Sequence, residues 1–297
     1  MGARREFIKS AGALALAGCT APMALAASKL LPTRPIPGTD QRLPVVGLGN
    51  SNAFKQGDSE RSGQLLRTFF DYGGGYIDCR GDSAFLVASL ARTLGGNDLA
   101  FLGSYFSAGR AEESRVAAQR LRAIRGRKTL DLMHTVPEDG VPNWDVLRGW
   151  KDEGLTQYIG LARHESRYYD AMMRVMATDT MDFLQVNLSP LETEAEDRIL
   201  PMAMDKGVAV TINRPFINGR YFSIVKGRSL PAWAVEFDCT SWAQFSIKYI
   251  LSHPAVTCVL TETANPRHAV DNIGGGFGRL PSAKTRVKMR QLIKSFV

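Results

Sequence analysis

Hydrophobic and polar positions alternate in blocks along the chain from Leu43 onward. Short apolar runs are typical of buried strands, and each one here is followed by a longer segment with apolar residues at helical spacing. The strand-like runs occupy residues 43–49, 76–79, 99–104, 129–134, 156–162, 181–189, 208–216 and 257–262. The helix-like segments occupy residues 60–74, 83–96, 112–125, 143–154, 166–177, 194–207, 240–252 and 266–273, with one more at 283–296.

Eight strand–helix units in a chain of 297 residues match the arithmetic of a (β/α)8 TIM barrel in a single domain. A doubly wound sheet is the alternative, with fewer strands and a glycine-rich phosphate loop after the first. The stretch GLGNSNAF at 47–54 does not supply the G-x-G-x-x-G pattern of that loop. The sequence therefore predicts an α/β fold of the TIM-barrel class.

The first residues do not fit this alternation. Paired Arg4 and Arg5 are followed by Phe7 and Lys9 and then by an apolar stretch of small residues, which is the order of a twin-arginine export signal. The stretch is too short and too rich in Ala and Gly to span a membrane comfortably. We therefore expect a signal peptide over residues 1–27, the barrel over 28–297, passage through the twin-arginine export machinery, and a place in the periplasm or cell envelope.

Processing of this segment has two readings, and the sequence leaves both open. The tetrapeptide at 16–19 resembles a lipobox in which Cys19 is lipidated, and only then would the protein contact a membrane. Ala24 to Ala26 offers a competing cleavage site. Cleavage after Ala26 leaves three cysteines in the mature chain, whereas lipidation keeps Cys19 as a fourth, membrane-anchored one. Neither outcome gives a disulfide scaffold.

Composition narrows the function classes. Charged residues make up 22% and the formal net charge is +8, but the lysines and arginines are scattered. Their densest run, at 120–128, is typical of the solvated end of an amphipathic helix. The chain shows no nucleic-acid-binding pattern, and its four histidines and four cysteines have no metal-ligand spacing. We expect neither a nucleic-acid partner nor a metal.

Candidate chemistry gathers where the predicted strands end, which is the active face of a TIM barrel. Asp78 is the most prominent, because a charged residue closes the short strand that follows three glycines. Several polar residues share that position: Asp78, His134, Gln185, Asn187, Asn213 and Arg214.

Several segments resemble the aldo/keto reductase family, and the likeness spans roughly residues 34–290. They are WKDEGLTQYIGLARHES, MDFLQVNLSP, AMDKGVAVTINRPF, LPAWAVEFDCTSWAQFSIKYILSHPAVTCV and the later DNIG. The resemblance implies a TIM barrel, NADP(H) lying across the strand ends, and reduction of a small-molecule carbonyl substrate.

The family's catalytic residues are an Asp, a Tyr that protonates the carbonyl oxygen, a Lys that lowers the pKa of the Tyr, and a His that orients the substrate. Asp78 stands at the position of the Asp. The loop DCRGDS that begins at Asp78 is shorter than in the family and lacks the Tyr. Tyr105 occupies the position of the family's Lys, and His134 stands two residues before the expected position of the His. The resemblance therefore gives Asp78, Tyr105 and His134 as catalytic candidates.

The segment LTETANPRHAVDN, at 260–272, resembles the family's cofactor segment. Thr263 and Asn272 match it, and Arg267 could reach a phosphate. Glu262 adds a carboxylate near the expected 2′-phosphate, so the choice between NADP and NAD stays open. The complete set of predicted cofactor-binding residues is Gln185, Asn187, Asn213, Arg214, Thr263, Arg267 and Asn272.

Two hypotheses for function remain. The first is an exported oxidoreductase that reduces a carbonyl with NADP(H) or NAD(H). The second is a barrel without catalysis that serves as a binding or accessory protein for a partner in the cell envelope, because the Tyr and Lys of the catalytic set are absent.

Overall fold

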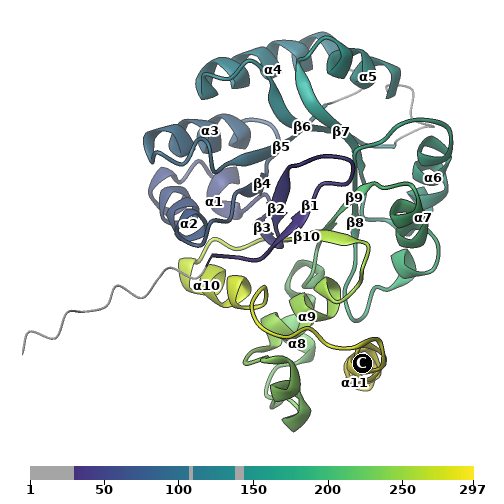
Figure 1. Ribbon diagram of the computed structural model, residues 1–297. Helices are drawn as coiled ribbons and strands as arrows, with labels where there is room; N and C mark the ends of the chain where they lie inside the picture. Colours follow the sequence, from purple (N-terminus) through teal and green to yellow (C-terminus); the bar gives the residue numbers. More distant parts are fainter. Residues whose placement is uncertain (1–29, 107–109, 138–143) are drawn as a thin grey trace, which may run out of the picture.

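The computed structural model describes residues 30–106, 110–137 and 144–297. The predicted export segment 1–27, with Cys19, lies outside these ranges. The barrel strands are β3 (Val46–Leu48), β4 (Tyr76–Asp78), β5 (Phe101–Tyr105), β6 (Leu130–Thr135), β7 (Thr156–Ala162), β8 (Phe183–Asn187), β9 (Ala209–Asn213) and β10 (Val256–Thr261). They pair in parallel and close in the order β10-β3-β4-β5-β6-β7-β8-β9 (Figure 1). The predicted single-domain TIM barrel is confirmed.

The helices form a ring around the barrel (Figure 1). They are α1 (Asn52–Lys55), α2 (Ser59–Asp71), α3 (Ser83–Thr93), α4 (Ala111–Arg125), α5 (Trp144–Asp152), α6 (Tyr169–Thr178), α7 (Ile199–Asp205), α8 (Arg220–Ile224), α9 (Trp242–Leu251), α10 (Pro266–Gly274) and α11 (Ala283–Lys294). Side chains of Asp58, Ser241, Asn265 and Ser282 accept backbone N–H bonds and fix the starts of four of them.

Alternation along the strands builds two apolar layers. Ile77 packs outward into the large core between strands and helices, whereas Tyr76 on the same strand packs inward with Leu132 and Phe183. Because successive side chains point to opposite faces, Asp78 also points inward, one step closer to the end of the strand. The strand pattern thus carries polar residues to one end of the barrel interior.

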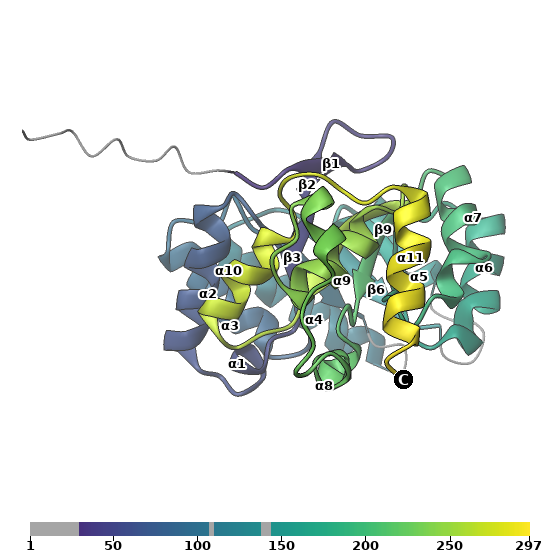
Figure 2. The same ribbon diagram turned by 90° about the horizontal axis from the view of Figure 1, so that it is seen from below.

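The opposite end of the barrel is covered by a hairpin that the sequence did not predict. It consists of β1 (Thr33–Pro35) and β2 (Arg42–Pro44), which pair antiparallel and lie across the barrel (Figure 2). Ile36 and Leu43 pack into the interior layer. The apolar run predicted as one strand over 43–49 is therefore divided at Val45, which is a correction to the prediction.

A second unpredicted feature follows β9, between the strand predicted over 208–216 and the helix predicted over 240–252. The chain forms the 3-10 turns η5 (Ile217–Gly219) and η6 (Ala232–Phe237), with α8 between them. Figure 2 shows α8 at the end of the barrel opposite the hairpin. Of the helices that the structure describes, none combines the length and the apolar character needed to cross a membrane.

The three cysteines within the described residues, Cys79, Cys239 and Cys258, are buried free thiols. Over the same residues, His, Cys, Asp and Glu side chains do not gather in groups of three or more that could hold a metal ion.

Candidate active site

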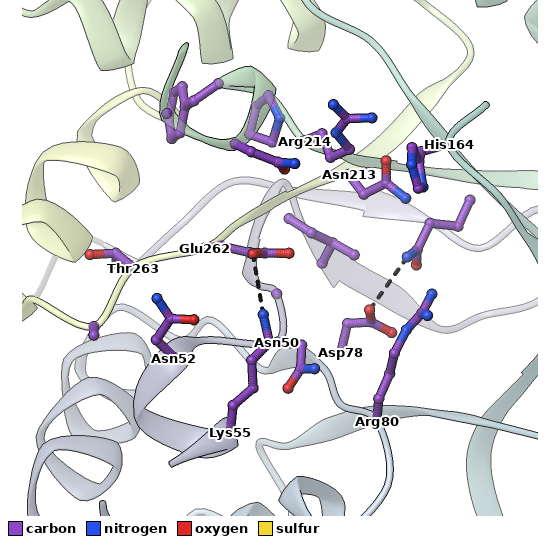
Figure 3. Close-up of a pocket in the computed structure, with 18 of the residues that line it drawn as sticks. Asn50, Asn52, Lys55, Asp78, Arg80, His164, Asn213, Arg214, Glu262 and Thr263 are labelled. Atoms are coloured by element: carbon purple, nitrogen blue, oxygen red, sulfur yellow. Dashed lines mark hydrogen bonds and ion pairs between the residues drawn. The ribbon is translucent and has the colours of Figure 1, made fainter. Parts of the chain in front are cut away.

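A cavity of about 720 Å³ opens at the end of the barrel where the strands end. Its wall comes from the loops after β3, β4, β7, β9 and β10, with Gln185 of β8 among the lining residues. Figure 3 shows Asp78 and Arg80 on one side, Asn213 and Arg214 across from them, and Glu262 and Thr263 farther along. The volume falls within the range of small-molecule sites.

Asp78 lines this cavity and is 5% exposed. Its Oδ2 accepts hydrogen bonds from the Tyr105 hydroxyl at 3.0 Å and from Gln185 Nε2 at 3.3 Å. The same Gln185 nitrogen lies 2.8 Å from the Tyr105 oxygen, so the three side chains form a closed triangle. Asp78 Oδ1 is buried without a hydrogen-bond partner in the structure. One carboxyl oxygen is therefore fixed and the other can carry a proton.

Burial raises the pKa of Asp78 to about 7. Attraction to the Arg80 guanidinium and the hydrogen bonds from Tyr105 and Gln185 oppose this rise but do not cancel it, because removing a charge from water dominates at a buried site. Near neutral pH the side chain is therefore shared between carboxylic acid and carboxylate. A group with such a pKa suits general acid catalysis.

Tyr105 lies behind Asp78, at the end of the neighbouring strand. Pairing of Asp78 with Gly103 puts Tyr105 two residues further along β5. The guanidinium carbon of Arg80 lies 4.1 Å from the centroid of the tyrosine ring. Burial and the Asp78 charge raise the pKa of Tyr105 well above its usual value. Among the described residues, those that line the cavity do not include Tyr105.

His134 lies deeper in the barrel interior and is fully buried. Its Nε2 is 3.3 Å from the Tyr76 hydroxyl, and its ring centroid is 5.4 Å from that of Tyr105. Burial lowers the pKa of His134 to about 3, so the imidazole is neutral at neutral pH. The structure brings the three catalytic candidates together, but only Asp78 faces the cavity.

The predicted cofactor-binding residues divide into two groups. Gln185, Asn213, Arg214 and Thr263 line the cavity. The other three lie elsewhere: Asn187 bonds to the Tyr169 hydroxyl and to Glu192, Arg267 is exposed on α10, and Asn272 is buried within α10.

The loop after β9 carries unusual backbone geometry. Arg214, Ile217 and Asn218 have φ angles of 51°, 51° and 52°, a region that side chains other than glycine rarely adopt. Asn213 Oδ1 and Arg214 Nε are buried without hydrogen-bond partners. Strained backbone and unpaired polar atoms at one cavity wall are typical of a segment shaped to hold a ligand.

Several residues of the cavity wall were not predicted from the sequence. Lys55, at the end of α1, reaches across the mouth to within 3.9 Å of Glu262 (Figure 3). Phe216 and Phe222 add an aromatic wall, with ring centroids 4.8 Å apart. No motif marks these positions, because a loop on one strand meets a loop on another only once the barrel closes.

Comparison with known proteins agrees with this architecture. The profile described as "Aldo/keto reductase family" matches residues 106–284, more than half of the chain. No curated protein matches the chain in sequence.

Solved structures give a broader likeness. An aldo-keto reductase from Klebsiella pneumoniae in complex with NADPH has a TM-score of 0.71 at 17% identity, covering 90% of this chain and 95% of that one. The holo form of an aldo-keto reductase from Bacillus halodurans has a TM-score of 0.69 at 14% identity, covering 89% and 96%. At these identities the likeness shows a shared fold.

Proposed function

The chain belongs to the aldo/keto reductase family, and on that premise we propose that it reduces carbonyl compounds with NADP(H), with Asp78 as the proton donor. The observation that carries the proposal is the buried Asp78 carboxyl at the cavity wall, with one oxygen held by Tyr105 and Gln185 and its pKa raised to about 7.

The cavity residues fit a dinucleotide. The unpaired Asn213 Oδ1 and Arg214 Nε suit an elongated polar ligand, and Gln185 and Thr263 line the same cavity. Lys55 lies 3.9 Å from Glu262 and offsets the carboxylate that would repel a 2′-phosphate. The NADPH named in the Klebsiella pneumoniae structure supports NADP(H) as the cofactor.

When bound, the reduced nicotinamide supplies a hydride to the carbonyl carbon. The protonated Asp78 carboxyl gives its proton to the carbonyl oxygen, and the alcohol leaves. The resulting Asp78 carboxylate is stabilised by hydrogen bonds from Tyr105 and Gln185 and by the nearby Arg80 charge. Water then returns the proton. Tyr105, behind Asp78 and with a raised pKa, positions the acid in this scheme.

Steady-state reduction of a simple aldehyde by NADPH, together with nucleotide binding, tests the proposal on the full chain. We expect the rate to fall as pH rises through about 7, because Asp78 then loses its proton. Asp78→Asn should lower kcat by about 100-fold or more with NADPH binding unchanged, and Tyr105→Phe by roughly tenfold. Loss of turnover in Tyr105→Phe with activity kept in Asp78→Asn would make Tyr105 the donor instead.

One observation favours the second candidate, a barrel that binds a ligand without catalysis. Among the described residues that line the cavity there is no tyrosine, and the only lysine is Lys55, paired with Glu262 rather than placed beside Asp78. NADPH binding without reduction of any aldehyde or quinone would support a binding or accessory role for an envelope partner.

Export is part of the proposal, supported by the order of residues at the start of the chain. We expect Arg4→Lys with Arg5→Lys to leave the protein in the cytoplasm of a host with an active twin-arginine pathway. Cell fractionation measures this, and labelling with a radioactive fatty acid decides whether Cys19 is lipidated. Unchanged export of the double variant would contradict this route.

A further inference from the structure

We propose that the cavity takes carbonyl substrates that carry a carboxylate, and that the Arg80 guanidinium binds this carboxylate beside Asp78. The inference rests on the proposed reductase function, since it names the substrate class of the same site. Oxo acids, among them formyl-substituted benzoates, are the compounds it describes.

The first support is the chemistry of Arg80. Its side chain lines the cavity two residues after Asp78, and its guanidinium lies over the Tyr105 ring. Within the described residues, the acidic side chains form no ion pair with Arg80 at 4.0 Å or less, although an arginine offers a planar fork that matches a carboxylate. One side-chain hydrogen bond joins Arg80 to Tyr105, and the remaining N–H donors of the five that a guanidinium carries can bind an anionic ligand.

The second support is that Arg80 is held in place. The Ser83 hydroxyl donates to the Arg80 carbonyl oxygen and also lies 3.1 Å from Asn50 Oδ1 in the loop after β3. Gly81 has a φ of 54° and allows the tight turn between them. Stacking on Tyr105 fixes the other end of the side chain. A cation placed in advance loses little conformational entropy when it binds its ligand.

The third support is the electrostatic field at this end of the cavity. His164 lines the wall, and burial is the largest cause of the lowered pKa of its imidazole. The Glu165 charge opposes this shift, whereas the charges of Arg214, Arg163 and Arg80 lower the pKa further. Arg214 also lies 3.8 Å from Glu192. Figure 3 shows Glu262, the other acidic wall residue, away from Arg80 and next to Lys55. The end that holds Arg80 is thus suited to a negative group.

The acid and the anchor are matched in position. Asp78 and Arg80 come from one strand end and face one cavity, so a carboxylate bound to Arg80 holds the carbonyl of an oxo acid on the same side of the cavity as the Asp78 carboxyl. A neutral aldehyde of the same shape would lack this second attachment.

Two measurements on the full chain test the inference. Calorimetry compares benzoate with benzamide in the absence of nucleotide, and kinetics with NADPH compare 4-formylbenzoate with its neutral methyl ester. We expect benzoate to bind at least tenfold more tightly, and the acid to have at least tenfold higher kcat/KM. Arg80→Gln should remove both preferences and Arg80→Lys should keep most of them. Arg167→Gln, at an exposed arginine that does not line the cavity, should change neither.

Equal affinity for benzoate and benzamide, no binding of either, or an unchanged preference in Arg80→Gln would overturn the inference. Circular dichroism of each variant confirms folding, and Arg80→Lys keeps the test valid should Arg80→Gln be unstable. Benzoate binding that depends on Arg80 without any turnover would refute the reductase proposal and leave the carboxylate site. Turnover of both aldehydes at the same kcat/KM would support the reductase proposal and refute the carboxylate site.

Discussion

Two buried ionisable side chains in the barrel interior have pKa shifts of opposite direction. Burial raises the pKa of Asp78 to about 7, so between about pH 4 and 7 the folded chain keeps a proton that the unfolded chain has released. Its contribution to stability is present at low pH and is lost as pH rises through this window. Burial lowers the pKa of His134 to about 3, so its contribution is present above about pH 6.5 and is lost as pH falls.

The two effects oppose each other between about pH 4 and 6.5 and partly cancel. Asp78→Asn removes the first, so we expect the free energy of unfolding of this variant to rise with pH more steeply than in the native chain, by up to about 1.4 kcal/mol per pH unit. His134→Gln removes the second and should give a steeper fall. Urea unfolding at a series of pH values measures both slopes. Profiles identical to that of the native chain would show that neither group is shifted.

At the residue scale, the sequence named Asp78 and Tyr105 as catalytic candidates, each at the end of a predicted strand. The structure places their oxygens 3.0 Å apart. The sequence could not say which of the two faces the cavity. That depends on the register, in which Asp78 pairs with Gly103, and on the Arg80 side chain that lies over the tyrosine ring.

Among the elements, β7 has a position where only glycine fits. A Cβ on Gly160 would lie 2.4 Å from the Phe183 carbonyl oxygen and 2.9 Å from His134 Nδ1, and the backbone atom cannot move aside. We expect Gly160→Ala to lower the free energy of unfolding by about 1–3 kcal/mol, as overpacking does. Chemical denaturation measures the loss.

Gly149, in the helix α5, is the matched control. A Cβ there meets no atom within 4 Å, so Gly149→Ala should stabilise the chain by about 0.5–1 kcal/mol through helix propensity alone. Equal effects of the two substitutions would contradict the close approach of β7 to β8 and His134.

Besides the packing of Ile36 and Leu43, an arginine attaches the hairpin β1–β2 to the barrel. Arg34 donates to the carbonyl oxygens of Leu251, at 2.5 Å, and Val256. We expect Arg34→Ala to lower the free energy of unfolding by about 2 kcal/mol, because buried carbonyl groups lose a charged donor. Arg42→Ala, in the same hairpin but exposed, should cost no more than about 0.5 kcal/mol. Thermal unfolding ranks the two, and a larger loss for Arg42 would show that the hairpin is held otherwise.

The eight barrel strands could be predicted because apolar runs bounded by glycine and polar residues leave few alternatives. The hairpin was missed because the run at 43–49 was interpreted as one strand, although Pro44 stands directly before the division at Val45 and is a residue that interrupts strands. The turns after β9 were missed because Ile217 adopts a positive φ angle that a β-branched residue rarely takes, and the Asn218-Gly219 pair, which does favour a turn, was not used.

At the scale of the whole molecule, the cavity lies between the loops that follow the first and the last barrel strands, β3 and β10. The Ser51 hydroxyl donates to the Thr263 carbonyl oxygen at 2.6 Å, and residues from both loops line the cavity. A ligand in the cavity bridges the first and last barrel strands, so it should stabilise the closed barrel. We expect NADPH at 100 times its dissociation constant to add about 2.7 kcal/mol to the free energy of unfolding, or roughly 5 °C in Tm.

Differential scanning fluorimetry with and without NADPH measures this shift, and adenosine, which lacks the phosphates and the nicotinamide, is the control ligand. A shift equal for both compounds, or none for NADPH, would contradict binding across the barrel mouth.

Closure of the barrel also has a consequence for synthesis on the ribosome. β3 pairs on one side with β4 and on the other with β10, where Val46 lies beside Val259. A nascent chain that has not yet reached β10 therefore leaves one edge of β3 without a partner, and exposed strand edges invite pairing with other chains. The last strand of the barrel must leave the ribosome before the first is safe from aggregation, so premature termination late in the message should yield insoluble protein rather than a smaller folded one.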